Sequence, residues 1–284
     1  MKKTNRKAKD TVFRMLYSDR KRALSLYNGV NGTDYVNPSE LQFNTLENAI
    51  FMNVKNDLSF ILADQLNLYE HQSSISANMP LRDLFYCADI LQKLYFDKTI
   101  YSSKAIMIPS PKFIVFYNGR ETLPERMELR LSDHFKRREK EPSLELKVTL
   151  LNINPEMNEE LKERCPSLRE YMQYVERVRE YAKDMETDAA VKRAVDECIA
   201  EGILKEFLQS QKAEVVKMSI YEYDEERELK LIREDERELG REEGESQFAQ
   251  LAENLLADLR MDDLIKATKD REFRLELYRE YCIL

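Results

Sequence analysis

Residues 56–73 read NDLSFILADQLNLYEHQS, and this stretch decides the fold. Two runs, 57–63 and 66–73, are rich in Leu, Ile, Phe or Tyr, and the pair Asp64-Gln65 between them suits a two-residue turn. The pattern predicts an antiparallel β-hairpin. Because both faces of the hairpin carry apolar side chains, we expect the sheet that contains it to be buried on both sides.

The turn fixes a register in which four couples of residues lie opposite each other: Ala63 with Leu66, Ile61 with Leu68, Ser59 with Glu70, and Asp57 with Gln72. Residues that pair directly share one face of the sheet. Asp57, Glu70 and Gln72 are therefore predicted to gather at one end of one face. A slip of one residue would move Asp57 to the opposite face, so the prediction depends on the register.

Two carboxylates and an amide at the polar end of a buried hairpin suit a divalent cation. Mg²⁺ takes oxygen ligands, usually one or two carboxylates together with waters and substrate phosphate. In such a position the ion can activate water and neutralise charge on a phosphodiester. The hairpin therefore predicts a Mg²⁺ or Mn²⁺ site that includes Asp57 and Glu70.

This arrangement resembles the PD-(D/E)XK nuclease superfamily, in which an Asp begins one strand and Asp/Glu-x-Lys follows on the next. The chain is similar to one branch of it, the Rpn-type recombination-promoting nucleases, also called PD-(D/E)XK nuclease family transposases. The resemblance spans roughly the first 210 residues and is carried by five stretches: KDTVFRMLYSD (9–19), NTLENAIFMNVKNDLSFIL (44–62), YEHQSSISANMPLRDLFY (69–86), IPSPKFIVFYNG (108–119) and CIAEGILKEFL (198–208).

The resemblance implies a metal-dependent DNA endonuclease linked to DNA recombination or mobile elements. It implies that Asp57 and Glu70 are metal ligands and that the main-chain carbonyl of His71 is a further one. Gln72 stands where the superfamily usually has Lys. Since Gln can hydrogen-bond but supplies no positive charge, this departure predicts weaker catalysis, with Gln72 orienting water or the scissile phosphate.

Two further residues are candidates for the same site. Members of the superfamily often use an early Glu as an additional acidic ligand, and Glu47 lies ten residues before Asp57; its alternative is a solvated or capping Glu. Arg82 falls in the first turn of a helix predicted from Pro80 to about Phe96, where helix terminus and guanidinium both favour a phosphate. The alternative for Arg82 is a surface Arg, or one paired with Asp83 or Asp89.

The fold class predicted is α/β, with a PD-(D/E)XK restriction-endonuclease-like core: a mixed four- to five-stranded sheet flanked by helices, followed by a helical C-terminal region. A helix is expected from about Asp10 to Tyr27. Further strands are expected at five places: somewhere in 40–54, and at 105–108, 112–117, 127–131 and 144–152. Later helices are expected near 156–164, 167–183, 187–201 and 203–212.

We divide the chain into a nuclease-like domain with helical additions (1–218), a charged linker helix (219–247) and a small helical module (248–284). Opposite charges in 219–247 lie at spacings that can pair along a helix, which has little apolar face of its own. Leu and Phe recur at helical spacing in 248–284, which predicts a cap or a homodimer formed through the C-terminal helices.

The composition of the chain argues against a membrane partner and against a zinc site. No apolar run approaches the roughly 18 residues of a membrane span, and the N-terminus lacks the features of a signal peptide. Four widely spaced Cys and two distant His argue against a zinc site, and thiols of this kind are typical of a reducing cytoplasm. We therefore expect a cytoplasmic protein with no membrane partner.

A net charge of −8 is unusual for a DNA-binding protein, but it is unevenly distributed. Residues 1–22 carry nine Lys or Arg against two Asp, whereas 222–245 carry twelve Asp or Glu against five Lys or Arg. The cluster HFKRREK (134–140) could contact backbone phosphate or could be an ordinary exposed loop. Two rival functions remain: a nucleic-acid-binding protein with a decayed site, and an oligomeric assembly protein.

Overall fold

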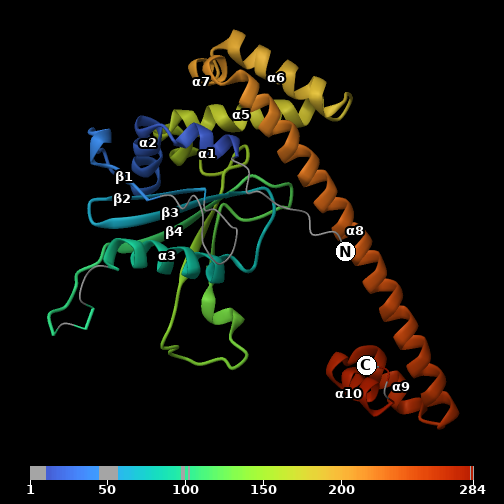
Figure 1. The fold of residues 1–284 in the computed structure, drawn as a ribbon. Helices are drawn as coiled ribbons and strands as arrows, with labels where there is room; N and C mark the ends of the chain where they lie inside the picture. The colour runs from blue at the N-terminus through green and yellow to red at the C-terminus, as the bar shows by residue number, and fades with distance from the viewer. Residues whose placement is uncertain (1–10, 45–56, 97–99, 102, 282, 284) are drawn as a thin grey trace. The chain divides into compact units, whose positions relative to one another are not determined.

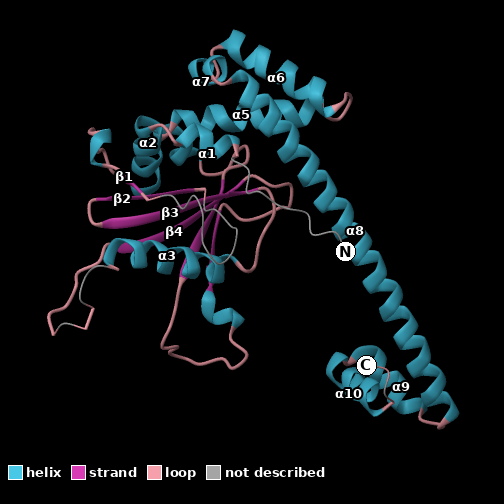
Figure 2. Ribbon diagram, viewed as in Figure 1, coloured by secondary structure: helices cyan, strands magenta, loops and turns pink. Residues whose placement is uncertain are grey.

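A computed structural model describes residues 11–44, 57–96, 100–101, 103–281 and 283. Within them, a mixed sheet is flanked by helices, and a helical region follows (Figures 1 and 2), which confirms the predicted α/β class. The strands are β1 (Gln42–Phe43), β2 (Leu58–Leu62), β3 (Gln65–Gln72), β4 (Ser110–Tyr117), β5 (Arg126–Arg130) and β6 (Lys147–Asn152). They lie in the order β1-β2-β3-β4-β6-β5; β3, β4 and β6 run parallel to one another, and the other pairs are antiparallel.

The helices of the described residues are α1 (Val12–Tyr17), α2 (Arg20–Asn31), α3 (Met79–Tyr95), α4 (Glu159–Arg164), α5 (Pro166–Tyr181), α6 (Thr187–Glu201), α7 (Lys205–Ser210), α8 (Lys212–Ala257), α9 (Met261–Lys269) and α10 (Arg271–Glu280). Two short 3₁₀ turns, η1 (Pro38–Glu40) and η2 (Leu131–His134), complete the set.

The sheet has six strands where four or five were predicted. Strand β1, which pairs Gln42 with Ile61 and Phe43 with Phe60, lies within 40–54, where a strand was predicted. Two residues are too few to show an alternating pattern, so the bounds of this strand could not be predicted, and residues 45–54 of that region lie outside the described residues. Strand β4 begins at Ser110, so the strand predicted at 105–108 is wrong.

The hairpin forms, but its turn lies one residue earlier than predicted. Ala63 and Asp64 connect the strands, with φ of 49° and 56°. Positive φ at both central residues belongs to the turn whose twist matches that of a two-stranded ribbon. The register pairs Leu62 with Gln65 and Ile61 with Leu66, a shift of two residues from the predicted pairing. Because side chains alternate with a period of two, this shift leaves every predicted face unchanged.

Each face of the sheet supports its own core. On one face, Phe60, Tyr69 and Phe116 pack beneath α1, α2, α5 and α6. On the other, Leu68, Val115 and inward residues of α3 form a second core. Figure 1 shows α3 on one side of the sheet with α1, α2 and α5 on the other, so the hairpin is covered on both sides as expected.

The helix predicted from Asp10 to Tyr27 is two helices instead. Asp19 adopts an extended conformation between them (φ −72°, ψ 125°) and its side chain accepts a hydrogen bond from the backbone N–H of Arg22. An Asp that caps a new helix start stabilises a break in the chain direction, which apolar spacing alone does not reveal. Gly32 then ends α2 in the left-handed conformation.

The remaining predicted helices of the first 212 residues lie close to the observed α3 to α7, and β5 and β6 fall where strands were expected. The charged stretch 219–247 lies wholly inside α8, so its helical prediction is confirmed.

The chain divides into two compact units, Met1–Tyr223 and Asp224–Leu284. The first holds the sheet and both cores on its faces. The second has a small core of its own that joins the end of α8 to α9 and α10, formed by Leu251, Leu255, Ala267, Leu277 and Tyr278. Among the described residues, no helix has the length and apolar character needed to cross a membrane.

Candidate functional site

Asp57 and Glu70 come together at the open end of the β2–β3 hairpin. The last pair of the ladder is Leu58 with Tyr69, and the next position along places Asp57 opposite Glu70. The backbone N–H of Asp57 donates to Glu70 Oε1 at 3.2 Å, and the N–H of His71 donates to Asp57 Oδ2 at 2.8 Å. Each carboxylate is therefore oriented by the backbone of the opposite segment.

Glu70 is buried, with 4% of its surface exposed. Burial raises the pKa of its carboxyl well above the ordinary value, and the charge of Asp57 raises it further, while Arg82 lowers it. A buried carboxylate beside a second one is costly to ionise unless a cation compensates both. The pair thus has the electrostatic character of a cation site.

Arg82 supplies part of that compensation. Its Nη2 lies 3.5 Å from Glu70 Oε2 and donates to the Tyr86 hydroxyl at 3.2 Å. The sequence left open whether Arg82 pairs with Asp83 or Asp89 or turns to a phosphate. The structure brings it to Glu70 instead, with about a third of its side chain exposed.

The sequence analysis missed Asp83 as a member of this environment. Asp83 is 1% exposed, and its Oδ1 has no hydrogen-bond partner among the residues that the structure describes. Burial raises the pKa of Asp83 to about 8, although Arg82 opposes the shift, and its charge contributes to the raised pKa of Glu70. Its position four residues after Met79, on the inward face of α3, was the signal available in the sequence.

His71 projects to the opposite face of the sheet from Glu70. Its ring stacks on Phe13 at 4.9 Å, and its Nε2 lies 3.3 Å from the Tyr171 hydroxyl. Burial lowers the pKa of His71 to about 3, with Arg179 adding to the effect, so the imidazole is neutral at pH 7. This aromatic cluster was not foreseen; it fixes the segment whose backbone N–H binds Asp57.

Gln72 lies on the same face as Glu70, as predicted. Its Nε2 donates to Met79 Sδ at 2.7 Å, which ties the end of β3 to the start of α3. The amide is thus directed toward the helix rather than toward Asp57. Glu47, the other acidic candidate, lies outside the described residues.

The donors that the structure brings together, the carboxylates of Asp57 and Glu70, fit Mg²⁺ or Mn²⁺ better than a softer metal, because their ligand atoms are oxygens. The described part of the chain contains no cluster of three or more His, Cys, Asp or Glu side chains arranged for a metal. Two carboxylates are nevertheless enough for Mg²⁺, which commonly retains several waters. The two carboxylates therefore fit an oxygen-liganded cation that keeps part of its hydration.

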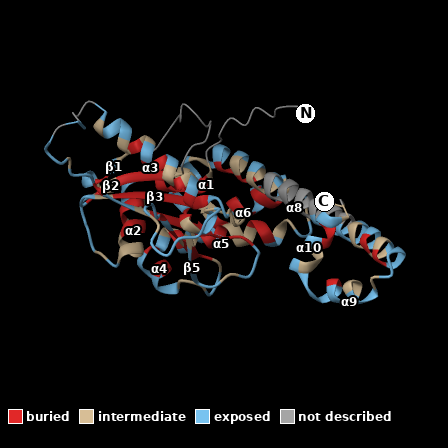
Figure 3. Cartoon of the chain, turned by 90° about the horizontal axis from the view of Figure 1, so that it is seen from below, coloured by how far each residue is buried: buried red, intermediate tan, exposed pale blue. Residues whose placement is uncertain are grey.

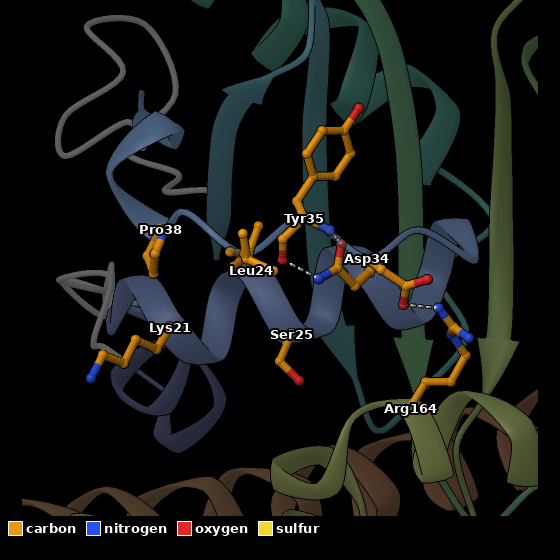
Figure 4. A pocket seen from close by; sticks show the side chains of 9 residues that line it. Lys21, Leu24, Ser25, Asp34, Tyr35, Pro38 and Arg164 are labelled. Atoms are coloured by element: carbon orange, nitrogen blue, oxygen red, sulfur yellow. Dashed lines mark hydrogen bonds and ion pairs between the residues drawn. The ribbon is translucent and has the colours of Figure 1, made fainter.

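A separate hollow of about 520 Å³ lies on the outer surface of α2 (Figure 4). Arg164 donates to Asp34 Oδ1 at 2.8 Å across it, and the Asn28 side chain donates to the carbonyl of Tyr35. These polar groups satisfy one another. None of the candidate site residues lines this hollow, and we assign it no ligand.

A second hollow of about 540 Å³ lies at the ends of β4 and β6, where Arg120, Arg179 and Lys183 are interspersed with three Glu. Its charges balance, so it does not by itself select an anion.

Comparisons with protein-family models, with curated proteins and with solved structures found no match for this chain.

Proposed function

We propose that this protein is a metal-dependent DNA endonuclease of the Rpn type, which hydrolyses phosphodiester bonds during DNA recombination or the movement of mobile elements, and that its core is of the PD-(D/E)XK kind. The observation that carries the proposal is the placement of Asp57 opposite Glu70 across the hairpin, each with a carboxylate oxygen held by a backbone N–H of the facing segment. The resemblance of the first 210 residues to those nucleases supports it.

In this proposal Asp57, Glu70 and the main-chain carbonyl of His71 hold Mg²⁺ or Mn²⁺. When bound, the ion supplies positive charge to the phosphodiester and makes water more acidic. Arg82 extends from Glu70 toward the exterior and stabilises charge that develops on the phosphate. Gln72 orients water or the scissile phosphate, for which its amide must leave Met79. His71 serves through its backbone, because its ring is neutral and turned to the other face.

The test is cleavage of plasmid and linear DNA with Mg²⁺ or Mn²⁺, comparing the native chain with Asp57→Ala. We expect nicking or cutting by the native protein, none after chelation, and loss of activity in the variant. Glu128→Ala is the control, since Glu128 is an exposed acidic residue on β5 that pairs with Arg130. Equal cleavage by the native chain and Asp57→Ala would refute the site.

A second candidate is a nucleic-acid-binding protein in which the site has decayed. The contact of Gln72 with Met79 favours it, because the amide that replaces the usual Lys is engaged in packing. The two functions differ in metal binding. Calorimetry that detects no Mn²⁺ binding, together with salt-sensitive DNA binding, would select the second.

A further inference from the structure

Tyr86 connects the buried side of α3 to the side chain of Arg82. The residue is 1% exposed and belongs to the core between α3 and the sheet, and Figure 3 shows red, buried residues beside pale-blue ones along this helix. Its hydroxyl accepts a hydrogen bond from Arg82 Nη2 at 3.2 Å, and the guanidinium carbon lies 5.9 Å from the centre of its ring. Because residues four apart in a helix lie one above the other, α3 itself brings the two side chains together.

The same nitrogen of Arg82 also faces Glu70, but less closely. Nη2 lies 3.5 Å from Glu70 Oε2, whereas a charge-assisted hydrogen bond between a nitrogen and a carboxylate is about 2.7–2.9 Å long. Arg82 is also about a third exposed, and an ion pair that is open to solvent does little to hold a long side chain in one geometry. The contact with the buried Tyr86 is therefore what fixes the position of the guanidinium.

The charge states of Tyr86 and Arg82 do not change near neutral pH. Burial and, after it, the charge of Glu70 raise the pKa of Tyr86 to about 12, so its hydroxyl stays neutral. Burial opposes the charge of Arg82, but Glu70 and Tyr86 outweigh it and raise the pKa of the guanidinium, which stays positive. A neutral acceptor and a permanently charged donor can keep their hydrogen bond whatever happens to the charge of Glu70.

Arg82 needs this second contact once Glu70 ligates a cation. Glu70 then attracts the guanidinium less, and the two positive charges repel each other. A long, partly exposed side chain held by Glu70 alone would turn into solvent. Because the hydroxyl of Tyr86 carries no charge, its hydrogen bond persists. The Nε and Nη1 of Arg82 have no hydrogen-bond partner among the described residues, and they remain for a phosphate.

We propose that Tyr86 is a positioning residue, whose hydroxyl holds Arg82 beside Glu70 both before and after a cation binds, so that the guanidinium is in place for a phosphate of DNA. This inference rests on the proposed function, because it concerns the same site. Tyr86 itself touches neither cation nor substrate and acts only through Arg82. Loss of its hydroxyl should therefore matter only while residue 82 is Arg.

The experiment is a double-mutant cycle on the full chain: native, Tyr86→Phe, Arg82→Gln and both changes together. Cleavage of a short fluorescent duplex with Mn²⁺ gives kcat and KM, and anisotropy of the same duplex in Ca²⁺ gives its affinity without requiring cleavage. We expect Tyr86→Phe to lower kcat/KM on the order of tenfold, since it removes a hydrogen bond to a charged group. Arg82→Gln should lower it at least as much, and the double variant should equal Arg82→Gln. The affinities should follow the same pattern.

Two matched controls separate this role from stability and from net charge. Tyr174→Phe removes another buried hydroxyl, which lies 2.6 Å from the hydroxyl of Ser219, and it should leave kcat, KM and affinity unchanged. Lys93→Gln removes a positive charge from α3 that pairs with Asp89, and it should also behave as the native chain. Circular dichroism and the melting temperature check that each variant is folded. Tyr86→Phe keeps the ring, so the core is retained.

The outcomes distinguish this inference from the function on which it rests. A native chain that neither cleaves nor binds the duplex refutes the proposed function, and the role of Tyr86 with it. If the native chain is active, a Tyr86→Phe protein that matches it, or a loss that is equally large in the Arg82→Gln background, overturns the role of Tyr86 alone. If the native chain binds the duplex without cleaving it, the four affinities complete the cycle and decide in the same way.

Discussion

At the scale of single residues, Glu70 is a buried carboxylate with other acidic side chains close by. Both properties suit it to bind a cation, and both make its charged form costly in the metal-free protein. Its side chain is buried, and its negative charge is opposed by Asp57 and Asp83 and relieved by Arg82. The single positive charge of Arg82 does not offset all of this negative charge, and a bound divalent cation would offset more of it. The stability of the metal-free protein and its affinity for metal should therefore respond in opposite directions to loss of this charge.

Glu70→Gln tests that relation. In chelator at pH 7 we expect an unchanged or higher melting temperature, because a buried charge is removed while the side-chain size is kept. The rise in melting temperature that Mn²⁺ gives the native protein, worth about 2.7 kcal/mol at a hundred times the dissociation constant, should vanish. Differential scanning fluorimetry measures both, with Glu128→Gln as the control. A Mn²⁺ response that persists in Glu70→Gln contradicts the site.

Asp83 makes a prediction about pH. Its side chain ionises near pH 4 in an unfolded chain but at about pH 8 in the folded one. Between these values the folded state holds the extra proton, so stability should fall as pH rises through the window. Asp83→Asn removes this pH dependence. The unfolding free energy of the variant should therefore exceed that of the native chain by an amount that grows to the order of a few kcal/mol by pH 9.

Urea unfolding of the native chain and Asp83→Asn in chelator at pH 5, 7 and 9 measures that difference. Asp89→Asn is the control, since Asp89 lies on the same helix and pairs with Lys93. A difference between the Asp83→Asn and native proteins that stays constant across this range would show that Asp83 is ionised in the folded state.

At the scale of elements, the hairpin explains why much of the site could be predicted. The alternation of residues 57–62 and 65–72 assigns each side chain to a face, and a turn misplaced by one residue shifts the register by two, which preserves the faces. Asp57 and Glu70 thus stay on one face. What the pattern could not give was their direct opposition, because that depends on which two residues adopt positive φ.

Other features escaped the sequence because they arise from packing between distant segments. The ring of His71 meets Phe13 of α1 and Tyr171 of α5, contacts that no local spacing encodes. The break at Asp19 was missed because the apolar pattern continues across it. The bounds of β1 were missed because two residues are too few to show an alternating pattern. Helices α5 and α6, by contrast, were predictable because one long apolar stripe lies on each.

The turn itself yields a prediction. Ala63 and Asp64 both have positive φ, which costs Ala63 roughly 1–2 kcal/mol and costs Asp64 less, since Asp tolerates this conformation better than most L-residues. The double change Ala63→Asn with Asp64→Gly gives the preferred turn sequence, and we expect it to raise the unfolding free energy by about 1 kcal/mol or more. Chemical denaturation measures it. Ala182→Gly, at φ −67°, is the control and should destabilise; a loss of stability in the turn variant would contradict this geometry.

The aromatic cluster that joins α1, β3 and α5 should govern stability in acid. The folded-state pKa of His71, about 3, lies below the ordinary 6.5, so its contribution is complete above pH 6.5 and is lost as pH falls toward 3. His71→Gln should be less stable at pH 7 but should lose less stability between pH 6.5 and 4. Denaturation across that range measures the slope; equal slopes in both proteins would mean that His71 does not titrate there.

At the scale of the whole molecule, an acidic protein proposed to bind DNA must concentrate its positive charge locally. The stretch 134–140 is the clearest internal concentration among the described residues, and Lys136, Arg137 and Arg138 are all exposed. They follow β5 and η2, whereas the strongest acidic excess of the sequence lies in 222–245 of α8. Phosphate binding depends on such local patches more than on the net charge of −8.

The salt dependence of DNA affinity tests this distribution without requiring cleavage. Each phosphate contact contributes about −0.9 to the slope of log affinity against log salt concentration. Arg137→Ala with Arg138→Ala should therefore weaken binding and make the slope shallower by about 1–2. The control is Lys192→Ala with Arg193→Ala, which removes the same charge from α6, where the two side chains pair with Asp188 and Glu197. If both double variants change the slope equally, net charge rather than the 134–140 loop governs binding.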